Sequence, residues 1–204
     1  MGSRIDRNLL ERKMNARHEA YTELMTRIQT GEARKAVIDE ICITAETFYK
    51  GGTAYFCGNG GSAADCEHFV AEFECMEPIN GIHLRAESLT RAAAVTAIGN
   101  DYGFEHIFER LLRNKAREGD VLYGISTSGK AVNVQRALDA AKDLGIYRVG
   151  IVGNGTRSME IIKRSDTAIV IPSSDTQSIQ QCYKQLLHDI WLSLVDVCNS
   201  IGNG

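Results

Sequence analysis

From residue 53 onward, short apolar runs alternate with stretches that have helical periodicity. The apolar runs lie at 54–57, 82–84, 121–125, 149–152 and 168–171. Candidate helices lie at 62–75, 88–98, 104–116, 130–144, 156–164 and 175–200. Strands that alternate with helices predict a parallel sheet covered by helices on both faces. The pattern therefore predicts an α/β fold.

The first fifty residues differ, because their apolar side chains recur at helical spacing. Two helices are expected there, one on either side of Gly31, and the glycines at 51–52 end the second. A length of 204 residues fits one domain with a sizeable core. We therefore expect a single domain over 1–204, with a helical segment at about 5–50 and an α/β core at about 53–204.

The composition excludes several classes of protein. The net charge is −3 and no dense block of Lys and Arg is present, which argues against nucleic acid as the main partner. No apolar run approaches membrane-spanning length and the N-terminus is polar, so neither a membrane span nor a signal peptide is expected. The six scattered cysteines include no C-x-x-C pair, which is typical of reduced thiols in a cytoplasmic protein.

A glycine-rich loop, Gly58–Ser62, follows the first apolar run and opens an expected helix. Backbone N–H groups at such a loop and at a helix N-terminus favour a phosphate group. His68 and Glu72 follow on that helix, and residues four apart share a helix face. The two side chains can therefore act on one atom. The alternative is a core histidine beside a surface carboxylate.

A second loop of this kind follows the third apolar run and carries Ser126, Thr127 and Ser128. Hydroxyl groups donate to phosphate oxygens, and the following helix adds positive potential at its N-terminus. One such loop alone is more often an ordinary turn with an N-cap, but two loops on one sheet favour a phosphate site. Both follow strands, and the carboxyl ends of parallel strands are where ligands bind.

Two further patterns carry less weight. Gly58, Gly60 and Ala63 fit a loose dinucleotide pattern, but a dehydrogenase has no need of the second hydroxyl-rich loop. Gln180 and His188 lie eight residues apart on the last expected helix, a rise of about 12 Å. Their side chains would have to converge to share a ligand, which is less natural than an i, i+4 pair.

Together these motifs resemble the SIS (sugar isomerase) domain superfamily and, within it, the phosphoheptose isomerase family. The resemblance covers the chain from about residue 35. Its carriers are 57–65 with His68, Phe69 and Glu72, then 97–104, 124–130 with 133–134, and finally 172–173, 175–176, 179–180 and His188.

The resemblance implies a three-layer SIS fold, with a five-stranded parallel sheet flanked by helices and extra N-terminal helices that pack a homotetramer. It implies aldose–ketose isomerisation of a sugar phosphate, from sedoheptulose 7-phosphate to D-glycero-D-manno-heptose 7-phosphate, through an enediol. This reaction feeds heptose to surface polysaccharide. In this family Zn²⁺ stabilises the charge that develops on the substrate oxygens.

The resemblance also assigns roles to residues of this chain. Catalysis falls to Glu72 as base and His188 as acid. The zinc ligands are His68, Glu72, Gln180 and His188. Substrate and phosphate contacts fall to Asn59, Gly60, Gly61, Ser62, Asp101, Ser126, Thr127, Ser128 and Gln180.

The chain departs from the family pattern around this site. A shorter loop, 73–78, follows Glu72 and lacks an expected arginine, and other residues replace the usual ones at Arg91, Ala131, Ser178, Gln181 and Tyr183. Two alternatives therefore stay open. One is an isomerase or sensor for another phosphosugar. The other is a non-enzymatic SIS scaffold like the protein that associates with the replication initiator, a type that lacks the histidine matching His188.

Overall fold

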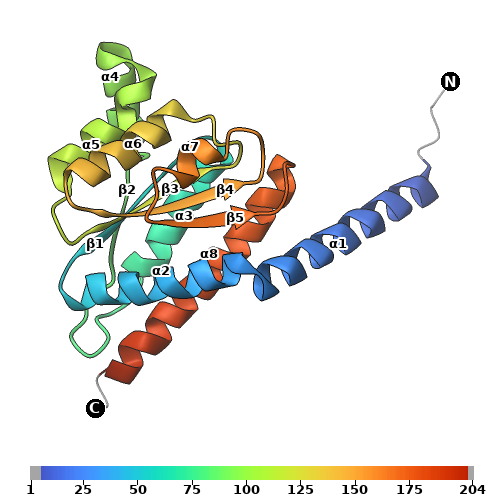
Figure 1. The fold of residues 1–204 in the computed structure, drawn as a ribbon, viewed down its shortest axis with the longest axis horizontal. Coiled ribbons are helices and arrows are strands. Elements are labelled where there is room, and N and C mark those ends of the chain that lie inside the picture. Colours follow the sequence, from blue (N-terminus) through green and yellow to red (C-terminus); the bar gives the residue numbers. More distant parts are fainter. Residues whose placement is uncertain (1–5, 202–204) are drawn as a thin grey trace.

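The computed structural model describes residues 6–201, so the outer ends of the expected domain, 1–5 and 202–204, lie outside the described residues. Two long helices come first, and strands then alternate with helices (Figure 1). The elements are α1 (Arg7–Thr30), α2 (Glu32–Tyr49), β1 (Thr53–Gly58), α3 (Gly61–Glu74), β2 (Arg85–Ser88), α4 (Ala92–Tyr102), the 3₁₀ turn η1 (Phe104–His106), α5 (Ile107–Lys115), β3 (Val121–Ser126), α6 (Val132–Asp143), β4 (Tyr147–Gly153), α7 (Met159–Ile162), β5 (Thr167–Ile171) and α8 (Thr176–Ile201).

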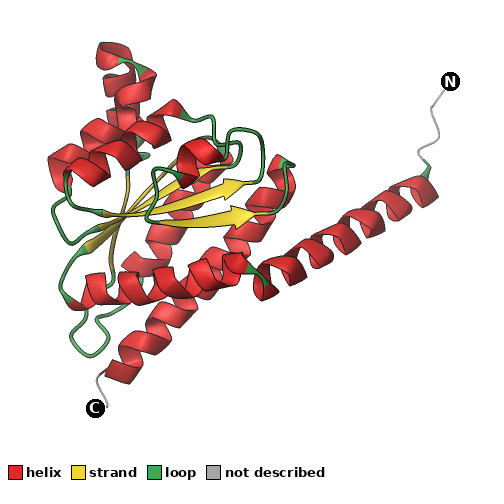
Figure 2. Ribbon diagram, viewed as in Figure 1, coloured by secondary structure: helices red, strands yellow, loops and turns green. Residues whose placement is uncertain are grey.

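The five strands form one sheet in the order β2-β1-β3-β4-β5, and every neighbouring pair is parallel. Helices lie above and below this sheet (Figure 2). The predicted α/β fold, a five-stranded parallel sheet between helices, is therefore confirmed. Within the described residues, no helix has the length and apolar character that crossing a membrane requires.

Successive strand residues point to opposite faces of the sheet and so build two cores. Phe56 and Tyr123 face α2, α3 and α8, and their rings stack with centroids 4.5 Å apart. Tyr55 and Leu122 face α5, α6 and α7 on the other side. Fully burying a side chain of this size contributes about 1.5–3 kcal/mol. The helices that will carry the site are thereby held against a rigid sheet.

The two expected N-terminal helices meet at Gly31, as predicted. The second half of α1 packs into the first core through Leu24 and Ile28. Its first half projects away from the rest of the chain and exposes Leu9 and Met14 (Figure 1). The start of α1 therefore contributes little to the fold of a single chain.

The second strand lies further along the chain than predicted. Ile82 and Leu84 are buried, but they lie in a loop, and β2 starts at Arg85 because that residue pairs with Thr53 of β1. The apolar side chains at 82–84 therefore indicated burial correctly, but they did not indicate which residues pair with β1. The expected helix at 88–98 is displaced in the same sense, because α4 begins at Ala92.

The expected helix at 156–164 is also wrong in extent, since α7 has only four residues. Ser158 explains this. Its hydroxyl donates to the carbonyl of Gly153, and its backbone N–H donates to the carbonyl of Gly155 at 3.1 Å. These bonds hold the segment as a turn against the end of β4, so a helix starts only after Ser158.

The strand order places a crevice beside β1. After β1 the chain crosses to β2 on one side, and it then returns to β3 on the other. In open parallel sheets the connections at such a switch point leave in opposite directions, which leaves space for a ligand at the carboxyl ends of the strands. The two phosphate-type loops follow β1 and β3, so both lie at this point.

Candidate active site

The two loops lie side by side because their strands pair in register up to Gly58 and Ile125. The first loop turns through Gly60, whose φ is +57°, and α3 begins at Gly61. The second loop turns through Gly129, whose φ is +72°. A Cβ atom on Gly129 would lie 2.3 Å from the carbonyl oxygen of Arg157, so only glycine fits there.

Asn59 and Asn133 bridge the two loops. Each amide nitrogen donates to the other's oxygen, at 2.8 and 2.9 Å. The oxygen of Asn133 also accepts the backbone N–H of Val134 at 2.9 Å. Asn59, expected as a substrate residue, thus braces the first loop against the N-terminus of α6.

Hydroxyl groups gather at the ends of the same strands. Ser126 is buried at the end of β3, Thr127 is half-buried and Ser128 is exposed. Ser62 is buried in the first turn of α3. The N-terminus of α3 and the loop before α6 therefore combine hydroxyls with helix-end N–H groups, a combination that suits a phosphate.

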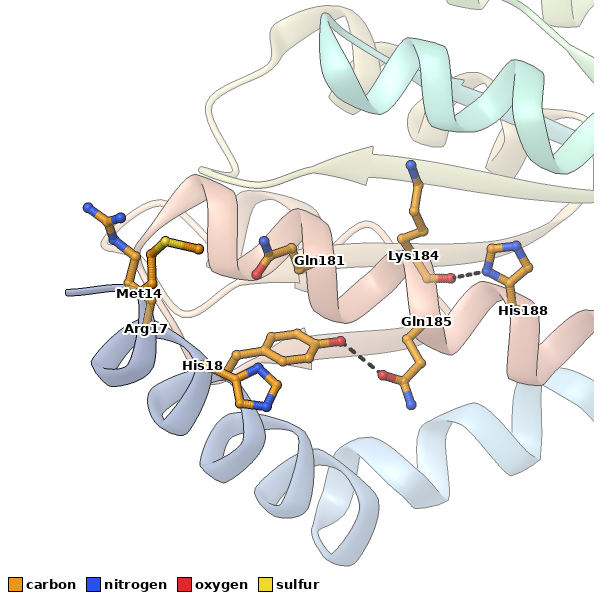
Figure 3. A pocket seen from close by; sticks show the side chains of 8 residues that line it. Met14, Arg17, His18, Gln181, Lys184, Gln185 and His188 are labelled. Carbon is orange, nitrogen blue, oxygen red and sulfur yellow. Dashed lines mark hydrogen bonds between the residues drawn. The ribbon is translucent and has the colours of Figure 1, made fainter. Parts of the chain in front are cut away.

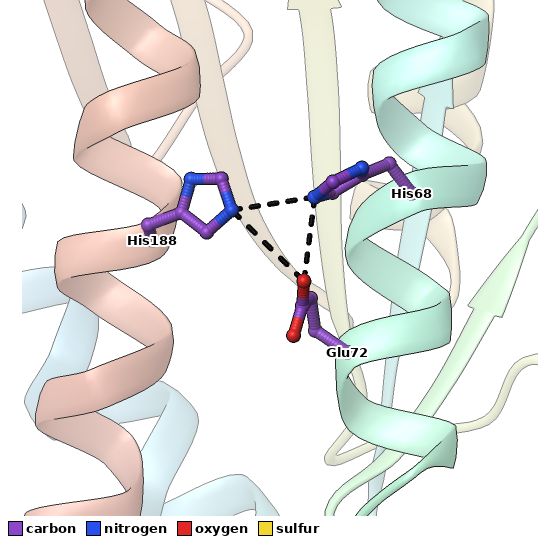
Figure 4. Close-up of side chains that lie close together, drawn as sticks. All are labelled: His68, Glu72 and His188. Atoms are coloured by element: carbon purple, nitrogen blue, oxygen red, sulfur yellow. Dashed lines mark hydrogen bonds and ion pairs between the residues drawn. The ribbon is translucent and has the colours of Figure 1, made fainter.

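Helices α3 and α8 lie side by side and run in the same direction. At their start, Gln180 packs so closely on Gly61 that a Cβ atom there would lie 2.6 Å from its Nε2. Two turns later, His68 faces His188 (Figure 4). This register places the end of α8 that holds Gln180 at the phosphate-type loop and brings His188 to the functional face of α3.

His68, Glu72 and His188 form a cluster in which three ligand-type atoms converge (Figure 4). The Nε2 atoms of the two histidines are 3.3 Å apart. The Oε1 atom of Glu72 is 3.4 Å from His68 Nε2 and 4.0 Å from His188 Nε2. The predicted i, i+4 pair therefore shares a helix face, and α8 adds the second histidine.

The backbone of α8 fixes the orientation of His188. Its Nδ1 atom lies 2.9 Å from the carbonyl oxygen of Lys184. A carbonyl only accepts, so Nδ1 carries a proton and Nε2 of the neutral ring presents its lone pair to the cluster. Phe69 packs edge-on against the same ring with centroids 5.0 Å apart. The imidazole is therefore held ready as a ligand or a proton acceptor.

The cluster has the chemistry of a cation site. Two imidazole nitrogens and a carboxylate oxygen are ligands that Zn²⁺ prefers. Nitrogens bound at about 2.0–2.1 Å in a tetrahedral arrangement lie about 3.3 Å from each other. The two histidine nitrogens are already at that separation. His68, Glu72 and His188 could thus hold a divalent metal with little rearrangement.

Asp101 takes a different position from the other expected site residues. It is exposed on α4 and accepts a hydrogen bond from Asn100 at 2.8 Å. Helix α4 projects from the body of the chain, and none of its residues is buried (Figure 1). The described contacts therefore connect Asp101 to its own helix and not to the cluster.

Three polar residues that the sequence analysis did not assign lie between the loops and the cluster. The carboxylate of Asp65 is within 2.8 Å of both the Tyr183 hydroxyl and the Lys184 ammonium. The sequence could have indicated that Asp65 shares a helix face with His68 and Lys184 with His188, since each precedes its histidine by one turn. What the sequence could not supply was the pairing of α3 with α8.

The cluster opens toward α1. A groove of about 750 Å³ lies between α1 and α8 beside His188 (Figure 3). The hydroxyl of Tyr21 donates to Gln185 at 2.9 Å and ties α1 to this groove. A second hollow, of about 580 Å³, lies beside Asn59 and Arg136. Open space therefore borders both the cluster and the first loop.

Comparison with known proteins identifies the family of the chain. The SIS domain family matches residues 18–153. The phosphoheptose isomerase of Rhodospirillum rubrum is 38% identical over 79% of this chain and 85% of its own length. Phosphoheptose isomerase 1 of Campylobacter jejuni is 39% identical over 87% of this chain and 95% of its own length.

A solved structure shares the fold closely. The phosphoheptose isomerase GmhA from Neisseria gonorrhoeae superimposes with a TM-score of 0.82 and 32% identity, over 91% of this chain and 99% of that one. Family match, sequence identity and fold all cover most of the chain. The chain therefore belongs to the SIS-domain family and, within it, to the family of phosphoheptose isomerases.

Proposed function

We propose that this protein is an aldose–ketose isomerase that converts sedoheptulose 7-phosphate to D-glycero-D-manno-heptose 7-phosphate. The observation that carries the proposal is the convergence of Glu72, His68 and His188 on one point, two helix turns from a phosphate-type loop. A sugar phosphate has the matching layout, because its phosphate lies at the opposite end from its carbonyl. Relatives named phosphoheptose isomerase are 34–42% identical to the chain, which supports a heptose phosphate as the substrate.

The phosphate end of the substrate would lie at the switch point of the sheet. Ser126, Thr127 and Ser128 supply hydroxyl donors, and the loop 60–62 supplies the N-terminus of α3. Hydrogen bonds to a charged group are worth about 1.5–3 kcal/mol each. Both loops would therefore bind the phosphate, and the sugar would lie toward the groove between α1 and α8.

The reacting end of the substrate would lie at the cluster. Moving a carbonyl from C2 to C1 requires a base that takes a proton from carbon and an acid that serves the oxygens. Glu72 is our candidate base, since its carboxylate is half-buried and lies beside His68. His188 is the candidate acid, because its Nε2 lone pair can take a proton from one substrate oxygen and return it to the other.

We propose Zn²⁺ as the cofactor. His68, Glu72 and His188 would hold it. Gln180, the fourth expected ligand, lies against Gly61 at the start of α3 and not at the cluster. When bound, the ion supplies positive charge that stabilises the negative charge developing on the substrate oxygens. Elemental analysis of protein purified without chelator should find about one zinc per chain. Absence of metal, together with activity that does not respond to added zinc after chelation, would refute this assignment.

The function is tested by incubating the protein with sedoheptulose 7-phosphate and following formation of the aldose. We expect turnover by the wild-type protein and a loss of about 10²–10⁴-fold in the His188→Gln variant. His83→Gln is a matched control, because His83 is exposed in the loop before β2. No aldose from the wild-type protein, or full activity of His188→Gln, would overturn the proposal.

We further propose that the protein works in the cytoplasm as a homotetramer. The first half of α1 exposes Leu9, Leu10 and Met14 at 42–65%, and a second copy would cover these side chains. Covering an apolar helix face of this kind is a common basis for symmetric assembly.

A further inference from the structure

A buried chain of polar groups connects the first phosphate-type loop to α8. The hydroxyl oxygen of Tyr183 lies 3.0 Å from Ser62 Oγ and 2.8 Å from Asp65 Oδ2. The ammonium group of Lys184 donates to the other carboxylate oxygen, Asp65 Oδ1, at 2.8 Å. Figure 3 shows the Lys184 side chain extending from α8 toward α3. Ser62, Asp65 and Tyr183 are all buried, so water cannot replace these contacts freely.

The number of protons available to these polar groups determines which group donates in each hydrogen bond. A phenol has one proton, while an ionised carboxylate only accepts. Lys184 pairs with Asp65, as expected for an ionised carboxylate, so the proton of Tyr183 goes to Asp65 Oδ2. The contact between Tyr183 and Ser62 then needs its proton from Ser62. Burial raises the pKa of the Tyr183 phenol, which keeps that group protonated.

We infer that Tyr183 is a positioning residue that accepts the hydroxyl proton of Ser62 and so leaves only the lone pairs of Ser62, and not its proton, for a phosphate bound at the first loop. This inference rests on the proposed function, because it concerns the phosphate site of that reaction. Side-chain donation to the phosphate is then left to Ser126, Thr127 and Ser128. The backbone N–H of Ser62 already donates to the carbonyl of Asn59 at 3.0 Å, so Ser62 itself offers the phosphate no donor.

The inference has a consequence for ligand charge. A phosphate monoester loses its second proton with a pKa of about 6, so at higher pH it is a dianion that only accepts hydrogen bonds. The lone pairs of Ser62 then face the lone pairs of the phosphate. Removing the hydroxyl of Tyr183 would release the Ser62 proton for the ligand and tighten phosphate binding. A residue with only a structural role would not improve affinity when truncated.

Calorimetric titration with inorganic phosphate at pH 8 tests this. We expect Tyr183→Phe to lower the Kd by about tenfold, the effect of one gained hydrogen bond to a charged group. Adding Ser62→Ala to that variant should return the Kd to the wild-type range. A Kd that Tyr183→Phe leaves unchanged or raises, or a gain that survives the second substitution, would overturn the inference. The Tyr147→Phe control also loses a bonded phenol, at the start of β4 and so at the opposite end of the strands from the loops, and should not tighten binding.

Neutron diffraction of the wild-type protein tests the proton order without any ligand. It should show one deuterium on Tyr183 directed at Asp65 and one on Ser62 directed at Tyr183. A deuterium on Tyr183 directed at Ser62 would refute the inference. If the wild-type protein fails to bind phosphate while the proton order is as inferred, the phosphate site of the proposed function fails and the inference about Ser62 stands.

Discussion

Two carboxylates of this chain show how environment decides the use of a residue. Glu72 is half-buried beside two histidines and reaches solvent through an open site. Glu40 is fully buried in α2, where Thr44 donates to its Oε1 at 2.8 Å and the hydroxyl of Tyr123 donates to the same atom. The first carboxylate can exchange protons with a substrate, whereas the second can only affect the stability of the fold.

Replacing Glu72 with Gln should abolish proton transfer while largely sparing substrate binding. The amide keeps the shape of the side chain but cannot take a proton from carbon, so turnover should fall by about 10²–10⁴-fold. Exchange of solvent hydrogen into C1 or C2 of the substrate measures this step separately from product formation. Exchange at the wild-type rate in Glu72→Gln would assign the base to another residue, His68 or His188 being the nearest.

Glu40 should make the fold less stable as pH rises. Burial raises its pKa from 4.5 to about 8, so the folded state prefers the protonated form. The stabilisation is complete below about pH 4.5 and is lost as pH rises toward 8. Relative to acid conditions the loss at pH 7 is roughly 3 kcal/mol. Glu40→Gln, which stays neutral, should be more stable than wild type at pH 8 by denaturant unfolding, and the two should converge near pH 5.

The exposed Glu46→Gln on the same helix is the control for that measurement. Its carboxylate pairs with Lys50 at the surface, where removing the charge changes stability by under about 1 kcal/mol. Equal pH dependence of unfolding in wild type and Glu40→Gln would show that Glu40 is not the group that titrates.

At the scale of elements, the apolar runs predicted four of the five strands and missed the edge strand β2. Strands β1, β3 and β4 are apolar and buried over most of their length, and β5 is apolar with alternate residues buried, so their composition marks them directly. Strand β2 lies at the edge and reads Arg85-Ala86-Glu87-Ser88, which no apolar pattern can find. The shared helix face of His68 and Glu72 was predictable from their i, i+4 spacing, but the contact of Gln180 with Gly61 depends on how α8 lies on α3.

That contact gives a test of the pairing between the two helices. Gly61→Ala should displace the Gln180 amide, since the new Cβ would lie 2.6 Å from its Nε2. Helix propensity favours alanine by up to about 1 kcal/mol, so thermal stability should hold. We expect kcat/KM for the sugar phosphate to fall about tenfold, the loss of one well-placed polar contact. Gly155→Ala, where a Cβ meets open space, should leave kcat/KM unchanged.

At the scale of the whole molecule, the site depends on three segments that are distant in sequence. The sheet order brings the loops after β1 and β3 together, and the first core holds α8 along α3. Motif spacing predicted that His68 and Glu72 share a helix face, because spacing within one helix is fixed. It could not predict that Asp101 lies on a projecting helix, or that Tyr183 lies between Ser62 and Asp65, because both depend on packing between elements.

The projecting half of α1 predicts how copies of this chain associate. Met14 is 65% exposed on α1 and lines the groove beside His188, so a partner that covers it would also enclose that side of the active site. Four chains of 22.5 kDa should give a mass of about 90 kDa in light scattering. Met14→Glu with Leu10→Glu should lower this mass, because burying the two new carboxylates in the interface would cost free energy. Met159→Glu, at an exposed position of α7, should leave the mass unchanged. A monodisperse wild-type monomer at micromolar concentration would contradict the assembly, and isomerase activity of that monomer would show that the groove works without a second copy.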